Sequence, residues 1–335
     1  MATTYGPIHS GTSYGLLYTP LSISPTIGTF AGSTHVVIAV TDSSKITSAA
    51  IDGINLTSFA IDDATHVSGN TVAHAVGPCN VTVSTSINTT RGASGDPLAN
   101  GYSFYDPAFN PMVIGTPKVW LDSTNLTQGS GIVTAIVDGS SSGTIVTIDA
   151  SYEPSYTATN INYVNQPTFN IDNTGNSQFV RLTNHGITTG AFTVVFVGNG
   201  KDRSWMGDGS GNVTVTGGGG SGDKFAITED ASTVLTSTTV AYDVPGVYIA
   251  VFNGTSSKLY TSAITATATG TAGPLGNLTG GRINVGNYGS FTPSTVTGMN
   301  GSIRHFILYS GALNQTDCAS LLTNLGAASG LVISS

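Results

Sequence analysis

The sequence predicts an all-β protein. Short runs rich in β-branched and aromatic residues recur along its 335 residues, and Gly, Asn, Asp, Ser or Pro usually lies at their ends. Charged residues make up only 8% of the chain, so the Glu, Lys and Arg that favour helices are scarce. Hydrophobic residues make up 39%, which is enough apolar material for folded cores. These observations favour sandwiches or jelly rolls over helical bundles, coiled coils and disordered chains.

Eight segments have the composition of strands. In chain order they are His35–Val40, Ile46–Ile51, Val81–Ser86, Ile132–Val137, Thr144–Ile148, Phe192–Val197, Val247–Phe252 and Ile303–Tyr309. Strict alternation in the last segment places Ile303, His305, Ile307 and Tyr309 on one face and Arg304, Phe306 and Leu308 on the other. We therefore expect both faces of this strand to be substantially covered.

One helix is expected, over residues 314–325. Leu321, Leu322 and Leu325 form an apolar stripe at helical spacing. Asn314 or Thr316 can accept hydrogen bonds from the free backbone N–H groups of the first turn.

The chain divides into an N-terminal arm and two domains. Residues 1–21 are rich in turn residues and fit no core pattern, so we interpret them as an arm. The aromatic run Tyr102–Tyr105 and two nearby prolines predict that a first domain spans residues 22–106 and a linker spans 107–116. The remaining residues, 117–335, are numerous enough for a large two-sheet domain.

Composition excludes several classes of protein. The net charge is −8 with only 10 Lys and Arg residues, so binding to nucleic acid is not expected. No apolar run of about 18 residues is present, so no membrane insertion is expected. The two cysteines, Cys79 and Cys318, have no disulfide or metal-site spacing and are interpreted as free thiols, with a bridge as the minority interpretation. The N-terminus also lacks the pattern of a secretory signal.

The first domain resembles the IPT/TIG family of immunoglobulin-like domains. The resemblance is carried by four segments: Ile23–Thr34, Ile46–Phe59, Gly77–Ser84 and Asn100–Tyr105. They are similar to the Pro- and Gly-rich first strand, the central strand–turn–strand, an alternating strand and the closing aromatic strand of that family. The resemblance implies an immunoglobulin-like β-sandwich that acts as a spacer or partner-binding module, with no catalytic residue.

The second domain resembles laminin-G-like, concanavalin A-like lectin domains of bacteriophage and bacterial surface proteins. Its opening, Pro117–Thr127 and Gly129–Ser140, looks like the first two strands of that family. Its end is similar to the closing strand and short C-terminal helix, over Met299–Tyr309 and Gly311–Leu322. The resemblance implies a concanavalin A-like jelly roll with a short C-terminal helix. Residues 247–260 depart from it, because Ser257–Tyr260 stands where many relatives have an Asp-Gly turn.

Two speculative sites follow. Carbohydrate binding would combine aromatic rings with Asp and Asn side chains, and the candidates are Trp205, Asp208, Asn212, Tyr288 and Phe291. The alternative for Trp205 is that it fills the edge of the sandwich. A Ca²⁺ ion could bind the hard oxygen ligands of Asp202, Asp208 and Asn212, whose alternative role is that of solvated turn residues. No other cofactor is expected.

Catalytic residues are not predicted. A glycosidase needs paired carboxylates, but the only two glutamates, Glu153 and Glu229, are isolated in the sequence. The six histidines are scattered without ligand spacing. No strand–turn–helix nucleophile motif is present.

We therefore expect a non-enzymatic structural protein on the virion surface of a bacteriophage, as a capsid decoration, head fibre or tail-associated protein. Its expected partners are other virion proteins, bound through the N-terminal arm, and cell-surface or environmental glycans. We expect a homo-oligomer or many copies per particle, because multivalency strengthens weak adhesion. Three alternatives remain: a bacterial adhesin exported without an N-terminal signal, a polysaccharide-acting enzyme, and a structural cement protein without a ligand.

Overall fold

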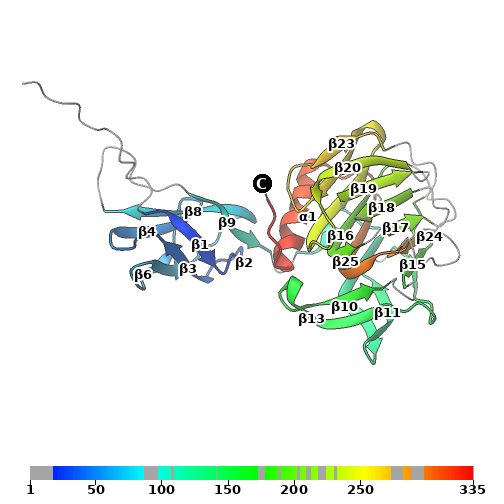
Figure 1. Cartoon of the computed structure of the whole chain (residues 1–335), viewed down its shortest axis with the longest axis horizontal. Coiled ribbons are helices and arrows are strands. Elements are labelled where there is room, and N and C mark those ends of the chain that lie inside the picture. Colours follow the sequence, from blue (N-terminus) through cyan, green and yellow to red (C-terminus); the bar gives the residue numbers. More distant parts are fainter. Residues whose placement is uncertain are drawn as a thin grey trace, which may run out of the picture. The chain divides into compact units, whose positions relative to one another are not determined.

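The chain forms two compact units in a computed structural model, residues Met1–Tyr105 and Asp106–Ser335 (Figure 1). The structure describes residues 18–86, 97–106, 109–140, 142–172, 178–187, 190–201, 204–208, 213–217, 224–229, 232–272, 282–287 and 298–334. The division between the units lies beside the domain end predicted at residue 106. No helix in the described part of the chain is long and apolar enough to cross a membrane.

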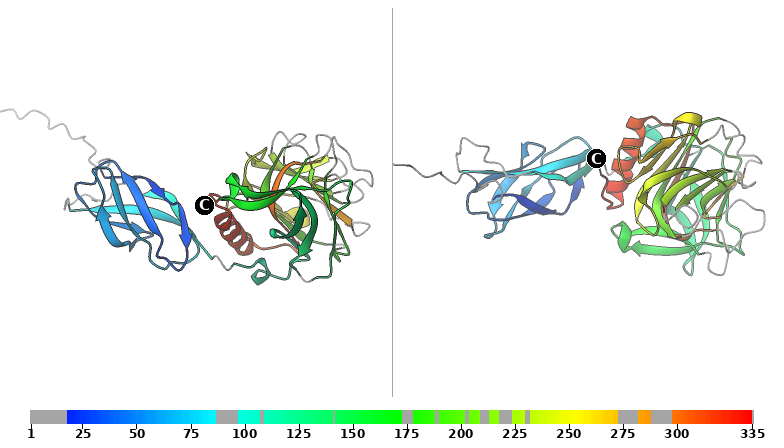
Figure 2. Two further views of the ribbon diagram at one scale, coloured as in Figure 1. Left: turned by 90° about the horizontal axis from the view of Figure 1, so that it is seen from below. Right: turned by 45° about the horizontal axis from the view of Figure 1, so that its top comes forward.

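The first unit is a sandwich of two sheets (Figure 2). One sheet has the order β1-β3-β7-β6, with bounds Pro20–Ser24, His35–Val40, His66–Asn70 and Thr57–Ile61. The other has the order β2-β9-β8-β4-β5, with bounds Ile27–Thr29, Leu98–Tyr105, Gly77–Thr85, Ile46–Ile51 and Ile54–Asn55. Alternate residues of β3 and β8 point inward, so Val36, Ile38, Val81 and Val83 meet in one core with Phe104.

The second unit contains two larger sheets. The nine-stranded sheet has the order β10-β11-β13-β14-β25-β16-β21-β22-β23, with bounds Val119–Gly129, Ile132–Asp138, Ser155–Asn160, Gln166–Ile171, Asn300–Ser310, Phe192–Lys201, Gly246–Phe252, Ser257–Thr261 and Ala268–Gly270. The seven-stranded sheet has the order β12-β15-β24-β17-β18-β19-β20, with bounds Ile145–Thr147, Val180–Thr183, Arg282–Val285, Ser204–Asp208, Val213–Gly217, Lys224–Glu229 and Ser232–Val240. The all-β prediction is therefore confirmed.

The nine-stranded sheet is buried on both faces at its centre. Val194 and Phe196 of β16 face the core between the two sheets, where they join side chains of the seven-stranded sheet such as Val215. Val195 and Val197 face a second apolar cluster beneath the helix. A central strand that is covered on both sides explains why this segment is continuously hydrophobic instead of alternating.

The α-helix α1 spans Gln315–Ala328 and covers the outer face of the nine-stranded sheet. The side chain of Asn314 accepts a hydrogen bond from the Asp317 N–H at 2.9 Å, so the predicted cap is formed. The buried side chains of Leu321 and Leu322 pack in the cluster beneath the helix. In Figure 2, α1 lies in red outside the strands of this unit.

Strand β25 corrects the predicted alternation. Ile303 packs in the core between the sheets with Phe306, whereas Ile307 faces α1. The register of β25 against β16 shifts between the Val197–His305 and Gly198–Ile303 pairs, so that one residue of β25 has no counterpart. This irregularity is a β-bulge, and a bulge reverses the face on which the preceding residues lie.

The segment predicted as a linker packs against the second unit. A 3₁₀ helix, η2, spans Pro111–Val113, and the Asn110 side chain accepts a hydrogen bond from the Met112 N–H at 2.9 Å. The Tyr309 hydroxyl donates to the Pro111 carbonyl at 2.9 Å. Phe109 and Ile114 join the apolar cluster beneath α1. Residues 109–114 are therefore part of the second unit's structure.

Candidate functional site

Trp205 lies inside the second unit. Its side chain is fully buried, and its ring centroid lies 4.8 Å from that of Tyr248 and 5.6 Å from that of Phe196. A Cβ atom added at Gly217 would lie 2.1 Å from the indole, which shows how closely the backbone approaches the ring. The indole therefore has no face open to a sugar. It packs in the core between the two sheets and comes from a central strand, so it does not fill the edge of the sandwich as the alternative supposed.

The other predicted site residues are only partly covered by the structure. Asp208 is buried at the end of β17. Asp202, Asn212, Tyr288 and Phe291 lie outside the described residues. The Ca²⁺ site and the remainder of the carbohydrate site therefore stay predictions.

Acidic side chains of the second unit hold local structure together. Asp138 accepts a hydrogen bond from the Ser140 hydroxyl at 2.6 Å. Asp243 accepts one from the Asn199 amide at 2.8 Å and lies 3.0 Å from the Lys201 ammonium group. Carboxylates occupied in this way stabilise turns and neighbouring strands and are poorly placed to act as acids or bases on a substrate.

A buried charged group lies where β25 exchanges one neighbouring strand for another. β25 pairs with β14 over Gly301–Ile303 and with β10 over His305–Leu308, so Arg304 stands at the junction. The guanidinium of Arg304 donates to Asp122 at 3.2 Å and to Ser123 at 2.8 Å. These contacts compensate the burial of a charged side chain at the bulge, so we assign this group a structural role.

Burial shifts the protonation equilibria of this group. Desolvation lowers the pKa of His305 to about 4, with help from the charge of Arg304 and against the opposing charge of Asp122. Burial by itself would raise the pKa of Asp122, but the neighbouring His305, the Thr124 N–H and Arg304 together hold it below its usual value. At neutral pH His305 is therefore uncharged, and Arg304 is the cation that pairs with Asp122.

Three side chains with metal-ligand chemistry meet in the first unit. One ligand atom from each of Asp52, His74 and Cys79 lies within 4.8 Å of the others, and this is the single such group within the described residues. His74 Nε2 lies 3.8 Å from an Asp52 carboxylate oxygen, and His74 Nδ1 lies 3.6 Å from Cys79 Sγ. Asp52 is exposed, His74 is half-buried and Cys79 is buried, so the group extends inward from the surface.

Each member of this group is held by a different part of the fold. Asp52 and Gly53 form the two-residue turn between β4 and β5, with φ angles of +50° and +80° as a type I′ turn requires. The His74 ring stacks on Phe104, with their centroids 4.9 Å apart. Cys79 lies in β8 opposite Tyr102 of β9. The two cysteines of the chain are both free, as expected, and both are buried.

The Cys79 thiol is a poor nucleophile in this setting. Burial, followed by the negative charge of Asp52, raises its pKa to about 11. Only 2% of the residue is exposed. The Cys–His–Asp arrangement is thus unlike the low-pKa, accessible thiols of cysteine enzymes.

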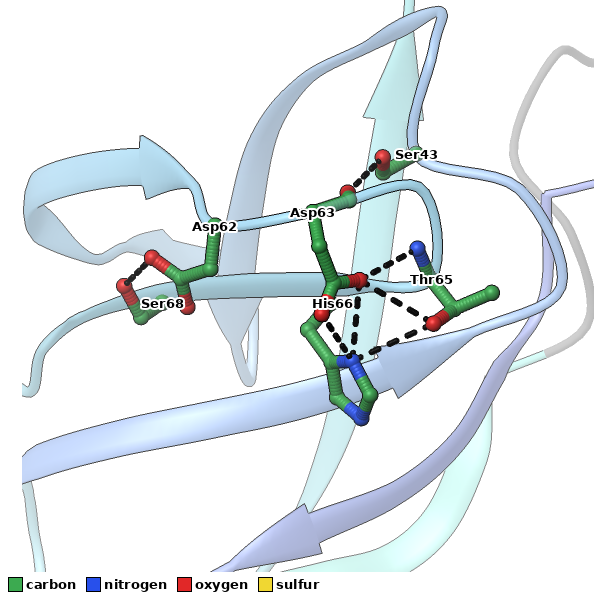
Figure 3. Close-up of polar contacts among 6 residues, drawn as sticks. All are labelled: Ser43, Asp62, Asp63, Thr65, His66 and Ser68. Carbon is green, nitrogen blue, oxygen red and sulfur yellow. Dashed lines mark hydrogen bonds and ion pairs between the residues drawn. The ribbon is translucent and has the colours of Figure 1, made fainter.

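A second Asp–His pair in the same unit, Asp63 and His66, stabilises the turn between β6 and β7 (Figure 3). The Asp63 carboxylate accepts hydrogen bonds from the Thr65 N–H at 2.7 Å and from His66 Nδ1 at 2.9 Å. The Ser43 hydroxyl donates to the Asp63 carbonyl. The Thr65 N–H, followed by His66, lowers the pKa of Asp63 to about 2. These contacts order the turn between β6 and β7 and, within the described residues, bring no third metal ligand.

The Asp52–His74–Cys79 group was missed by sequence analysis. Its members are separated by 22 and 5 positions, which matches no familiar ligand motif. Pairing of β4 with β8 brings Ile51 opposite Val81 and so places the turn beside Cys79. The one local signal was the Asp-Gly turn, which predicts a hairpin but no site.

No family model and no curated protein matches the chain. Among solved structures, it is similar to the binding domain of Paraclostridial Mosquitocidal Protein 1, with 9% identity, a TM-score of 0.47 and coverage of 63% of this chain and 52% of that one. The binding domain of botulinum neurotoxin serotype G has 11% identity, a TM-score of 0.43 and coverages of 62% and 50%. Trypanosoma rangeli sialidase in complex with sialic acid has 8% identity, a TM-score of 0.42 and coverages of 86% and 42%. The chain thus spans about half the length of the toxin domains that it matches.

Proposed function

We propose that the chain is a non-enzymatic structural protein on the surface of a bacteriophage particle, where it displays a lectin-like domain for weak attachment to carbohydrate. In this proposal the first unit is an IPT/TIG-like spacer and the second is a laminin-G-like, concanavalin A-like module. The N-terminal arm binds other virion proteins, and many copies per particle supply the avidity that a single weak site lacks.

The proposal rests on the structural role of the acidic side chains in the second unit. Asp122, Asp138 and Asp243 each accept hydrogen bonds or form ion pairs that hold strands and turns together. The described part of this unit brings together no group of three or more His, Cys, Asp or Glu ligand atoms. Carboxylates that are committed to structural contacts favour a binding or structural role over a catalytic one.

The composition predicts a surface with few charges, which exerts little electrostatic attraction or repulsion on other molecules. With only 8% charged residues, exposed positions are left largely to neutral polar residues such as Thr, Ser and Asn, whose side chains offer hydrogen bonds to hydroxyl-rich ligands. Such groups suit sugars better than phosphates or membranes, which call for clustered Lys and Arg.

The virion assignment is tested on phage particles purified by density gradient from cultures that produce this chain. Mass spectrometry should find the chain in the particle fraction, and antibodies against the full chain should label intact particles in electron micrographs. If the chain is instead absent from particles and labels bacterial surfaces, the adhesin alternative replaces this proposal.

Carbohydrate attachment is tested with the full chain displayed in many copies on an array of bacterial surface glycans. We expect binding that rises steeply with display density, without release of new reducing ends from the bound glycans. Release of reducing ends would establish the polysaccharide-acting enzyme. A blank array at all densities would favour the cement protein without a ligand.

A further inference from the structure

The hydrogen bond of His74 to the backbone determines which ring nitrogen carries its proton. His74 Nδ1 lies 2.8 Å from the Ala75 carbonyl oxygen, which can only accept. Nδ1 of the neutral ring therefore bears the hydrogen, and Nε2 keeps its lone pair. Metal-binding histidines are typically held in this way, with the second ring nitrogen donating to a carbonyl or carboxylate.

The lone pair of Nε2 and the Asp52 carboxylate then lie 3.8 Å apart with no proton between them. Two electron-rich groups at this distance call for a positive charge shared by both. The second oxygen of Asp52 is engaged elsewhere, because it accepts from the Asn80 N–H at 3.4 Å. One carboxylate oxygen is thus left to share a cation with His74.

The three donor atoms match the preferences and dimensions of zinc. Zinc binds imidazole nitrogen, thiolate sulfur and carboxylate oxygen at about 2.0–2.3 Å, so tetrahedral ligand atoms lie about 3.3–3.8 Å from one another. The Nε2–carboxylate distance of 3.8 Å lies at the upper end of this range. One ligand atom from each of the three residues lies within 4.8 Å of the others, so small side-chain movements would bring all three to one ion. A calcium or magnesium ion would instead need an all-oxygen shell, which Cys79 and His74 do not provide.

Backbone hydrogen bonds hold the segments that carry the donors. The backbone N–H of Asp52 donates to the Asn80 carbonyl at 2.8 Å, which ties the β4–β5 turn to the strand that carries Cys79. The backbone N–H of His74 donates to the Phe30 carbonyl at 2.9 Å. Donors held at both backbone and ring require little reorganisation to receive an ion.

We propose that Asp52, His74 and Cys79 bind a zinc ion in the first unit, with a water molecule as the fourth ligand. On binding, the Cys79 S–H bond breaks, the proton passes to solvent and the sulfur forms the bond to zinc. The charges of Zn²⁺, one carboxylate and one thiolate then sum to zero, so the half-buried site holds no net charge. The inference goes beyond the proposed function and does not depend on carbohydrate binding.

The test uses the full chain, stripped of metal, in a titration with zinc against a chromophoric chelator. We expect one equivalent of zinc per chain. Cobalt in place of zinc should give the thiolate-to-metal charge-transfer band and the intense visible bands of tetrahedral coordination. Both signals report binding without reference to any activity.

Two variants locate the site. Asp52→Asn removes the carboxylate, yet an Asn-Gly pair keeps the type I′ turn, so the fold is preserved. Its zinc affinity should fall at least tenfold. Cys79→Ala should abolish the charge-transfer band. If Cys79→Ala fails to fold by circular dichroism, Asp52→Asn decides alone.

Two matched controls remove the same chemistry elsewhere. Cys318→Ala deletes the other buried thiol, and Asp63→Asn disrupts the Asp–His pair of the β6–β7 turn. Both should retain wild-type zinc affinity and the cobalt spectrum. The proposal is overturned if the wild type binds no stoichiometric zinc, or if Asp52→Asn and Cys79→Ala bind it as tightly as the controls do.

Discussion

Trp205 illustrates how one residue type supports opposite predictions. An isolated Trp in a loop-rich stretch suggested a sugar platform, and the alternative was that it fills the edge of the sandwich. The structure surrounds the indole with Tyr248, Phe196 and Phe225. Phe225 of β19 and Tyr248 of β21 lie 20 and 43 positions from Trp205, so the sequence alone could not show that they enclose the indole.

Truncating the Trp205 side chain should destabilise the second unit whether or not a ligand is present. Trp205→Ala leaves a large cavity in a fully buried site, and we expect the free energy of unfolding to fall by about 3–5 kcal/mol. Urea denaturation followed by circular dichroism measures this change. A stable Trp205→Ala variant that loses only glycan binding would contradict the packing role.

His305 should make the stability of the second unit depend on pH. Its pKa is about 4 in the folded chain, where burial disfavours the charged ring, and near 6.5 when unfolded. Between these values the unfolded state binds more protons, so stability falls as pH decreases from about 6.5 to about 4. Burial lowers the pKa of His185 as well, which adds a contribution of the same sign.

Urea midpoints at pH 7, 6 and 5 measure this dependence. His305→Gln should reduce the slope of the free energy of unfolding against pH by the contribution of one titrating group. The contribution of His185 should remain. Equal slopes in the variant and the wild type would show that His305 does not titrate on unfolding.

At the scale of elements, segments whose hydrophobicity reflects burial were predictable. Strands β3 and β4 have the predicted bounds, His35–Val40 and Ile46–Ile51. Strands β17 to β20 were not predicted, because their apolar residues are interrupted by Thr, Ser, Gly or charged residues and form no continuous hydrophobic run. The faces of β25 were mispredicted because a bulge depends on register with a partner strand and leaves no mark in the sequence.

The helix cap offers a test at this scale. The Asn314 side chain accepts from the Asp317 N–H, one of the donors that a helix start leaves without a partner. Asn314→Ala should therefore lower the free energy of unfolding of the second unit by about 1 kcal/mol, whereas Asn314→Ser should cost less. Urea denaturation of both variants gives the comparison, and identical losses would exclude a capping role.

For the whole molecule, the separate cores of the two units predict two unfolding transitions. The core of the first unit contains Val36 and Ile38, the core of the second contains Phe196 and Phe306, and the two clusters share no residue. Calorimetry should resolve two transitions, with Ile38→Ala lowering one and Phe306→Ala the other. A single transition that both variants shift would instead indicate one cooperative unit.

The proposed zinc site links single residues to the whole molecule, because three side chains of the first unit would set the temperature of one of the two unfolding transitions. An ion that binds only the folded first unit stabilises it by about 2.7 kcal/mol at a free concentration of 100 times its dissociation constant. Zinc should therefore raise the transition that Ile38→Ala lowers and leave the other in place. In Cys79→Ala the addition of zinc should move neither transition. A zinc-dependent shift of the transition that belongs to Phe306 would place the bound ion in the second unit and contradict the assignment to Asp52, His74 and Cys79.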